Sequence, residues 1–184
     1  RICRITRCSR FLDVGSGAGD FALLLHNQGA SVATADSTAH RPFCTEKIDA
    51  IPHHTIDFET GQIHGVKSLD GTTIVLRHVL EHVKDPARFL ERLLSLNPAY
   101  FYIVVPNARS VERKLLGKYW YFWDPPRHLW HFHVEPLEIL FHRLKMAPLQ
   151  FGHDTIPDLI PSLYRFLRIH RFPKSLYQPL NPKS

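Results

Sequence analysis

Long apolar runs are absent from the sequence, and so is any cysteine pattern that would indicate a metal site. No apolar stretch approaches the roughly 20 residues of a membrane-spanning helix, and residues 1–10 are basic without the apolar core of a signal peptide. The three cysteines, Cys3, Cys8 and Cys44, are odd in number and lack the paired spacing of zinc ligands. Reduced thiols are the simplest explanation, and we expect a cytoplasmic location.

Positive charge exceeds negative charge, but it does not follow the pattern of a nucleic-acid-binding module. The formal net charge is +6, and much of the excess lies in residues 1–10 and 165–183. No stripe of interleaved basic and aromatic residues indicates an RNA-binding surface. We therefore expect no nucleic-acid partner, and at most a weak peripheral membrane contact through the basic C-terminal segment.

The length and the composition fit one globular domain. The chain has 184 residues, of which 44% are hydrophobic and 22% are charged, and this suits a single hydrophobic core. No internal repeat or low-complexity segment interrupts the sequence. We expect one domain over residues 1–184, with its core in residues 11–150 and a C-terminal extension in residues 151–184.

The segment FLDVGSGAG, residues 11–19, determines how the rest of the chain is interpreted. Residues 11–14 have the pattern of a buried strand that runs into three alternating glycines. A helical pattern in residues 21–27 follows and ends before Gly29. A strand, a glycine loop and a helix form the first unit of nucleotide-binding α/β folds, because glycine permits a tight turn and lets a ligand approach the backbone.

The glycine spacing distinguishes two classes of ligand. A dinucleotide loop, G-x-G-x-x-G read from Gly15, would need its third glycine where Asp20 stands. That carboxylate would lie at a helix N-terminus and repel a pyrophosphate, which disfavours an NAD-dependent oxidoreductase. The observed order, Asp13-x-Gly15-x-Gly17-x-Gly19, instead resembles the first motif of class I S-adenosylmethionine-dependent methyltransferases, whose cofactor carries no phosphate.

Further strand and helix patterns alternate along the chain. Strands are predicted in residues 31–35, 54–58, 72–76, 100–105 and 149–152. Helices are predicted in residues 41–51, 86–97, 108–118 and 135–145, and residues 162–170 form an amphipathic basic segment. This order predicts an α/β fold, a Rossmann-like, doubly wound and mostly parallel sheet flanked by helices.

Polar residues follow the ends of the predicted strands. These are Asp13 with its glycine loop, Asp36, Asp57 and the pair Arg77 and His78. Ligands of such sheets bind outside the carboxyl ends of the strands, so these residues are expected at one site. Asp36 lies roughly 20 residues beyond the glycine loop, the spacing at which a carboxylate can accept from ribose hydroxyls.

The order of several segments resembles class I methyltransferases, in the branch that includes ubiquinone-biosynthesis O-methyltransferases and related small-molecule enzymes. The segments are FLDVGSGAG, the strand end at Asp36, LRHVLEHVKDP, YFYIVVPN and PPRHLWHF, and the resemblance covers residues 11–147. It implies methyl transfer from S-adenosyl-L-methionine to a small-molecule acceptor. It also implies an N-terminal helix, which we expect to be missing here, and a last antiparallel strand, which the sequence does not show.

The resemblance also assigns a cofactor site. The predicted cofactor-binding residues are Asp13, Gly15, Ser16, Gly17, Gly19, Asp36, Asp57 and Arg77. It implies that the glycine loop contacts the methionine part of the cofactor through its backbone and that Asp36 holds the ribose. It further implies that Asp57 accepts from the adenine amino group and that Arg77 offers its backbone carbonyl to the cofactor ammonium.

The segment from His78 to His82 supports a second interpretation. It matches the H-x-x-E-H motif of inverzincin peptidases, in which two histidines on one helical face bind zinc and Glu81 acts as base. A peptidase gives no role to the glycine loop, so we disfavour it and predict no metal. Some ubiquinone-pathway methyltransferases bind a divalent ion through E-x-x-E-H, where His78 replaces the first Glu. Alternatively, Glu81 and His82 fix the loop by hydrogen bonds.

The segment KYWYFWDPPRHLWHFH, residues 118–133, contains all three tryptophans and three histidines. Aromatic walls suit a planar or apolar acceptor, and we predict that residues 119–133 lie over the cofactor methyl as part of its pocket. His128 and His78 are the catalytic candidates, with His128 as general base. His131 and His133 are expected at the rim. The alternative functions are a non-catalytic or truncated cofactor-binding scaffold and then an NAD-dependent oxidoreductase.

Overall fold

The chain forms two compact units in a computed structural model that describes residues 8–37, 50–150 and 152. One unit is Arg1–Val105 and the other is Pro106–Ser184. The predicted amphipathic basic segment at residues 162–170 lies outside the described residues, as does most of the predicted helix at 41–51. The expected single domain stays a prediction.

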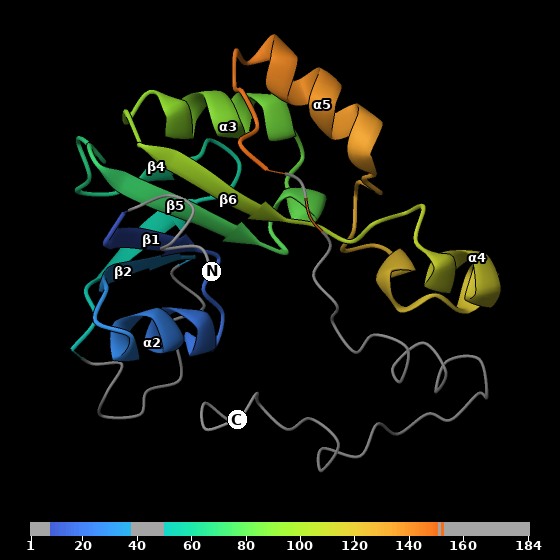
Figure 1. Cartoon of the computed structure of the whole chain (residues 1–184), viewed down its shortest axis with the longest axis horizontal. Helices are drawn as coiled ribbons and strands as arrows, with labels where there is room; N and C mark the ends of the chain where they lie inside the picture. Colours follow the sequence, from blue (N-terminus) through green and yellow to red (C-terminus); the bar gives the residue numbers. More distant parts are fainter. Residues whose placement is uncertain (1–7, 38–49, 151, 153–184) are drawn as a thin grey trace. The chain divides into compact units, whose positions relative to one another are not determined.

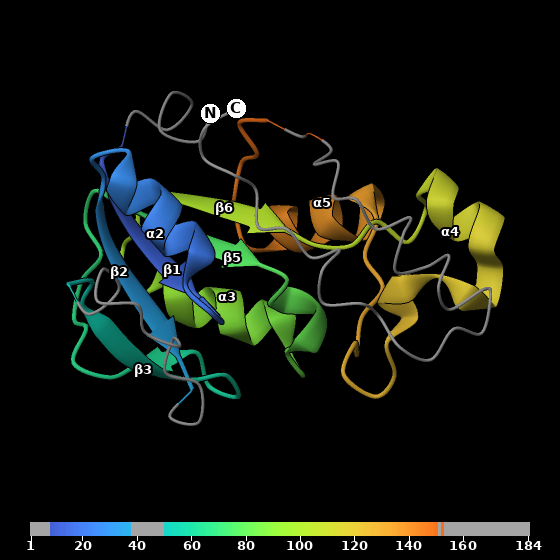
Figure 2. The same ribbon diagram turned by 90° about the horizontal axis from the view of Figure 1, so that it is seen from below.

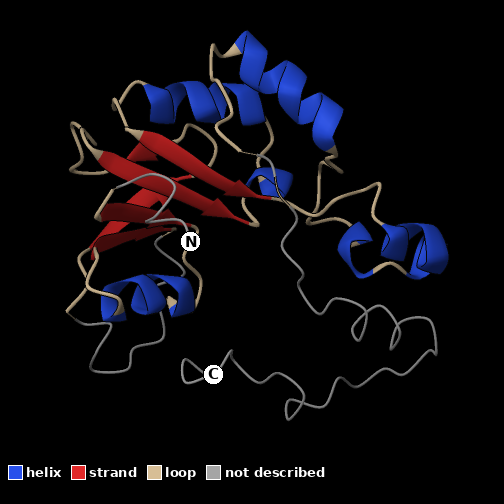
Figure 3. Cartoon of the chain, viewed as in Figure 1, coloured by secondary structure: helices blue, strands red, loops and turns tan. Residues whose placement is uncertain are grey.

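A six-stranded sheet forms the centre of the first unit, in the order β4-β3-β2-β1-β5-β6 (Figures 1 and 3). The strands are β1 (Arg10–Val14), β2 (Ser31–Asp36), β3 (His53–Asp57), β4 (Gln62–Ile63), β5 (Thr72–Arg77) and β6 (Tyr100–Val104). All neighbouring strands pair in parallel except β4, which runs antiparallel to β3. The predicted mostly parallel α/β sheet is confirmed.

Strand β1 is central, because it pairs with β2 along one edge and with β5 along the other. Val14, its last residue, lies opposite Ala35 of β2 and Leu76 of β5. The chain leaves β1 toward β2 and β3 on one side and returns to β5 on the other side. The strand order therefore reverses at β1, and the loop after it lies at the position where ligands bind in such sheets.

Helices cover both faces of this sheet, as a doubly wound fold requires. α2 (Asp20–Asn27) lies against one face and α3 (Pro86–Leu94) against the opposite face (Figures 1 and 2). Strand side chains alternate between the two faces, so each face contributes its own apolar layer. The apolar cluster between α2 and the sheet includes Ala22 and Leu25 of the helix, and its other buried members are Phe11, Ala30, Val32, Ile51 and Val75.

The second unit contains two α-helices among its described residues, α4 (Val111–Leu116) and α5 (Val134–Arg143). The Ser110 hydroxyl accepts a hydrogen bond from the Arg113 N–H at 3.1 Å and so begins α4. The predicted helix at 108–118 ends in a short 3₁₀ helix, Gly117–Tyr119, and a second one, Tyr121–Trp123, follows it. No helix in the described part of the chain is long and apolar enough to cross a membrane.

Two strand predictions differ from the structure. β4 was not predicted, because two residues carry too little alternation to distinguish a strand from a turn. The predicted strand at 149–152 is wrong for the described residues, since Leu149, Gln150 and Gly152 belong to no strand. Leu149 is 66% exposed, so its apolar character does not report burial here.

Helix α3 begins at the predicted cap. The Asp85 carboxylate accepts a hydrogen bond from the Arg88 N–H at 3.0 Å, and Pro86 occupies the first turn. We predict that Asp85→Ala lowers the free energy of unfolding by about 0.5–2 kcal/mol, because one helix-end donor loses its partner. Urea unfolding checks this, with exposed Glu91→Ala as the control that changes stability little. Equal stability of both variants would contradict the role of the cap.

Candidate functional site

The glycine loop between β1 and α2 has the left-handed backbone that its sequence predicts. Gly15, Gly17 and Gly19 have φ values of 71°, 54° and 81°, a region that favours glycine. The Gly15 N–H donates to the Ala35 carbonyl at 2.8 Å, and the Gly19 N–H donates to the Ser16 carbonyl at 2.8 Å. The loop is therefore tied to the end of β2 and turns directly into α2.

Two of these glycines are required for different reasons. A Cβ on Gly15 would lie 2.6 Å from Cγ2 of Val79, so this position must be small for the loop after β5 to pack against it. A Cβ on Gly17 would meet no described atom within 4 Å. The backbone of Gly17 therefore borders open space, which a ligand can occupy.

Asp36 joins the end of β2 to the glycine loop. Its Oδ2 accepts from the Gly17 N–H at 2.9 Å, and its Oδ1 accepts from the Ser37 N–H at 2.7 Å. Each carboxylate oxygen has a second lone pair, so both can still accept from a ribose diol. The buried Ser16 hydroxyl has no hydrogen-bond partner among the described residues, which leaves a polar atom in the loop for a ligand. These residues fit the predicted cofactor.

Asp13 is a buried acid with a shifted pKa. It is 3% exposed, and burial raises the pKa of its carboxyl from 3.8 to about 7. The positive charge of Arg77 lowers this pKa, the negative charge of Asp36 raises it, and the Ala22 N–H lowers it. Asp13, Asp36 and Arg77 are thus brought together electrostatically, as their places at neighbouring strand ends predicted.

Phe21 is part of this arrangement, although the sequence did not single it out. The Arg77 guanidinium lies 4.5 Å from the centroid of the Phe21 ring. Phe21 also stacks on Tyr102 of β6, with ring centroids 6.3 Å apart. The aromatic ring therefore holds the Arg77 side chain, whereas the predicted role of Arg77 used only its carbonyl. The only sequence feature that could have indicated Phe21 is its position directly after Asp20, on the first turn of α2.

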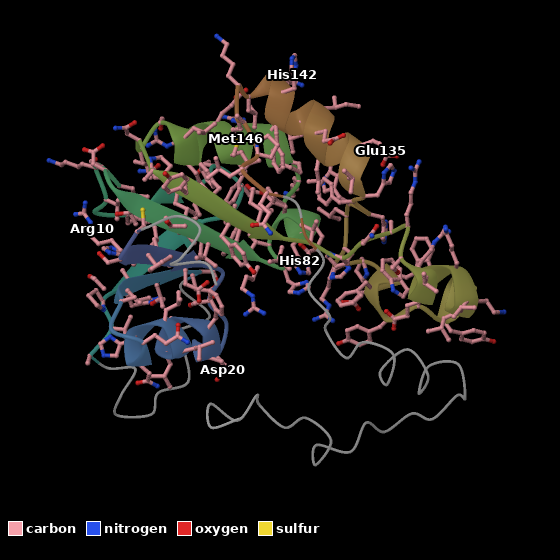
Figure 4. The ribbon with its side chains drawn as sticks, viewed as in Figure 1. Arg10, Asp20, His82, Glu135, His142 and Met146 are labelled. Atoms are coloured by element: carbon pink, nitrogen blue, oxygen red, sulfur yellow. The ribbon has the colours of Figure 1, made fainter. Side chains whose placement is uncertain are left out.

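The segment from His78 to His82 is a hydrogen-bonded loop, so the zinc-peptidase interpretation is wrong. His78 has a left-handed φ of 55°, and residues 80–82 form a single 3₁₀ turn, so the two histidines do not share an α-helical face. Figure 4 shows His82 beyond the end of β5. The His78 N–H donates to the Val104 carbonyl at 2.9 Å, and His78 Nδ1 lies 3.1 Å from Oε1 of buried Glu81. Glu81 thus orients the His78 ring.

Asp57 stabilises the turn between β3 and β4. Its carboxylate accepts from the Glu59 N–H at 2.8 Å and from the Thr60 hydroxyl at 2.9 Å. These two donors lower its pKa. Asp57 is exposed and lies at the carboxyl end of β3, and its predicted contact with adenine stays a prediction.

His128 is held firmly within the second unit. Its Nδ1 lies 2.7 Å from the Phe122 carbonyl, and its ring stacks on Phe122 with centroids 6.0 Å apart. A carbonyl can only accept, so Nδ1 carries the hydrogen and Nε2 is the atom that can take up a proton. Nε2 lies 3.9 Å from the Asp124 carboxylate.

The other two histidines of this segment make local contacts. His131 Nε2 lies 3.3 Å from the Trp123 carbonyl, to which it donates. His133 Nδ1 lies 2.6 Å from a carboxylate oxygen of Glu135, which is labelled in Figure 4. These contacts hold the segment together. The predicted placement of residues 119–133 over the cofactor stays a prediction.

Known proteins show which family has this fold and this sequence. A family model described as a methyltransferase domain matches residues 4–145, which is more than half of the chain. The chain belongs to this methyltransferase family. Its predicted cofactor, S-adenosylmethionine, is confirmed with the family, and the oxidoreductase alternative is excluded. The ubiquinone-biosynthesis branch stays a prediction.

Solved structures of distant proteins share the fold. A SAM-dependent methyltransferase from Archaeoglobus fulgidus is 19% identical, with a TM-score of 0.57 over 92% of this chain and 83% of that chain. A possible histamine N-methyltransferase from Thermotoga maritima is 14% identical, with a TM-score of 0.50 over 73% of this chain and 62% of that chain. No curated protein is significantly similar to the chain.

The buried Asp13 makes stability depend on pH. The folded methyltransferase keeps the Asp13 proton up to about pH 7, whereas the unfolded chain loses it near 3.8. Folding therefore takes up a proton between these values, and this stability contribution falls as pH rises from 4 to 7. The shift corresponds to at most about 4 kcal/mol, at about 1.4 kcal/mol per pKa unit.

We predict that Asp13→Asn removes this pH dependence, because asparagine resembles the protonated acid and does not ionise. Urea unfolding at about pH 4.5 and pH 7.5 measures it for both proteins. The free energy of unfolding of the variant, relative to that of the wild type, should be higher at about pH 7.5 than at about pH 4.5. The effects of the other titrating groups are the same in both proteins and cancel in this difference. The same difference in stability at both pH values would show that Asp13 is ionised in the folded protein.

Proposed function

We propose that the chain transfers a methyl group from S-adenosylmethionine to a small-molecule acceptor. Membership of the methyltransferase family supports the reaction. The observation that carries the cofactor site is the carboxylate of Asp36, which binds the Gly17 N–H at 2.9 Å and keeps acceptor capacity for a diol.

The cofactor supplies an electrophilic methyl on a sulfonium, and the chain holds and orients the groups around it. Asp36 accepts from the ribose hydroxyls, and the open backbone at Gly17 and the Ser16 hydroxyl receive the methionine part. The buried carboxyl of Asp13 sets the local potential together with Arg77. Orientation of this kind accounts for much of the rate in a direct displacement.

The aromatic segment at residues 119–133 provides the binding site for the acceptor and the general base. A small acceptor suits this segment, because Trp, Tyr and Phe side chains give rigid apolar walls. His128 offers Nε2 as a proton acceptor, with Nδ1 held by the Phe122 carbonyl. A base is needed if the acceptor loses a proton, as a phenol does. The predicted membrane contact at residues 165–183 lies outside the described part of the chain.

We predict that Gly17→Ala weakens binding of S-adenosylhomocysteine by about tenfold or more, because the new methyl group enters the space of the ligand. Gly29→Ala is the matched control: Gly29 also has a positive φ, 84°, and nothing within 4 Å of an added Cβ. Both variants should lose about 1–2 kcal/mol of stability from backbone strain. Isothermal titration compares the affinities. Equal affinities would place the cofactor elsewhere.

We predict that His128→Ala lowers methyl transfer by roughly 10²–10⁴-fold while cofactor affinity changes little, because it removes the base. His128→Asn separates this from a structural role, since its amide N–H can still donate to the Phe122 carbonyl but Nε2 is lost. If His128 is the base, both variants are equally slow. Recovery of activity in His128→Asn would make the residue structural. Cofactor binding by the wild type without turnover would indicate the scaffold.

A further inference from the structure

The second unit contains a cavity that shares Trp123, His128 and His131 with the acceptor segment of the proposed function. Its volume is about 630 Å³, within the about 300–1,000 Å³ of small-molecule sites. Every lining residue belongs to this one unit. The lining residues are Arg113, Lys114, Gly117, Lys118, Trp123, Pro125, His128 and His131. Three permanent cations thus line the cavity, together with no carboxylate.

These three cations differ from Arg109 and Arg127 of the same unit in their partners. Arg109 pairs with Glu135 and Arg127 pairs with Asp124. Arg113, Lys114 and Lys118 make no ion pair with any carboxylate in the described ranges. The buried Nε of Arg113 also lacks a hydrogen-bond partner among those residues. Converging cations without counter-charges raise the local positive potential, which favours an anionic ligand.

Trp123 gives the cavity an aromatic wall that is fixed in place. Its Nε1–H donates to the Gly117 carbonyl at 2.7 Å. The Arg113 guanidinium lies 5.3 Å from the Trp123 ring centroid, and the His131 ring contacts it edge-on at 4.8 Å. A rigid indole beside unpaired cations can bind a flat apolar group and an attached anion together.

We propose that this cavity binds a small organic anion, a planar apolar body that carries a carboxylate or a phosphate. Lys114 and Lys118 supply the charge, Arg113 supplies charge and an unsatisfied donor, and Trp123 contacts the planar body. This inference names the chemical class of the acceptor and rests on the proposed function, because Trp123, His128 and His131 of the acceptor segment line the cavity.

Titration calorimetry on the full chain tests this with four probes: phenyl phosphate, benzoate, neutral benzyl alcohol and inorganic phosphate. We expect phenyl phosphate and benzoate to bind, benzyl alcohol not to bind, and inorganic phosphate to bind more weakly than phenyl phosphate. Affinity should fall as salt rises, because the lysines are exposed. Binding of benzyl alcohol as tight as benzoate, or of inorganic phosphate as tight as phenyl phosphate, would overturn the proposal.

The double variant Lys114→Gln, Lys118→Gln assigns the site. Both side chains are exposed, so folding is preserved, and phenyl phosphate affinity should drop by about tenfold or more. The double variant Arg143→Gln, Lys145→Gln removes the same two charges from exposed residues outside the lining, and it should leave that affinity unchanged. An equal loss in both proteins would mean that overall charge, not this cavity, binds the anion.

Two further titrations separate other outcomes. In the first, the wild type and the lysine variant are mixed with vesicles that contain phosphatidylglycerol. The proposal is wrong if the wild type binds these vesicles, the lysine variant does not, and the wild type binds neither phenyl phosphate nor benzoate. The cations would then form a membrane-binding surface. S-adenosylhomocysteine is titrated in parallel. Binding of S-adenosylhomocysteine without binding of the anions would contradict this proposal and leave the methyltransferase function supported. Binding of the anions without S-adenosylhomocysteine would support the cavity and contradict the proposed cofactor site.

Discussion

The pairing of β1 with a parallel strand on each side is the constraint on which the site depends. Pairing with β2 and β5 fixes the register and the direction of β1, so Val14 lies opposite Ala35 and Leu76. The residues that follow these three strands must then converge. A shift of one residue in either register would move every side chain to the other face and separate Asp36 from Gly17.

Burial and charge work against each other beside this loop. Burial disfavours the ionised form of the Asp13 carboxyl and raises its pKa. The positive charge of Arg77 lowers this pKa, but it offsets only part of the effect of burial. Arg77 is itself held by the Phe21 ring. The position of the cation therefore depends on helix packing, and the acid depends on the cation. The electrostatics of the site are in this way a product of the packing between α2 and the sheet.

The first unit could be predicted largely from the sequence, because its signals are local. The glycine loop, the strand ends and the cap at Asp85 each need only neighbouring residues to be recognised. β4 could not be predicted, since two residues have no period. The packing of Gly15 against Val79 was also invisible, because it joins positions far apart in the chain. Likewise, whether Lys114 or Lys118 has a counter-charge depends on tertiary structure.

The contact between Gly15 and Val79 links two loops that the sequence places far apart. A side chain at position 15 would need both a left-handed backbone and a smaller neighbour at position 79. The two positions therefore cannot evolve independently. Among relatives of this chain, any gain of volume at the first glycine should be matched by a loss of volume in the loop after β5, so the pair should covary.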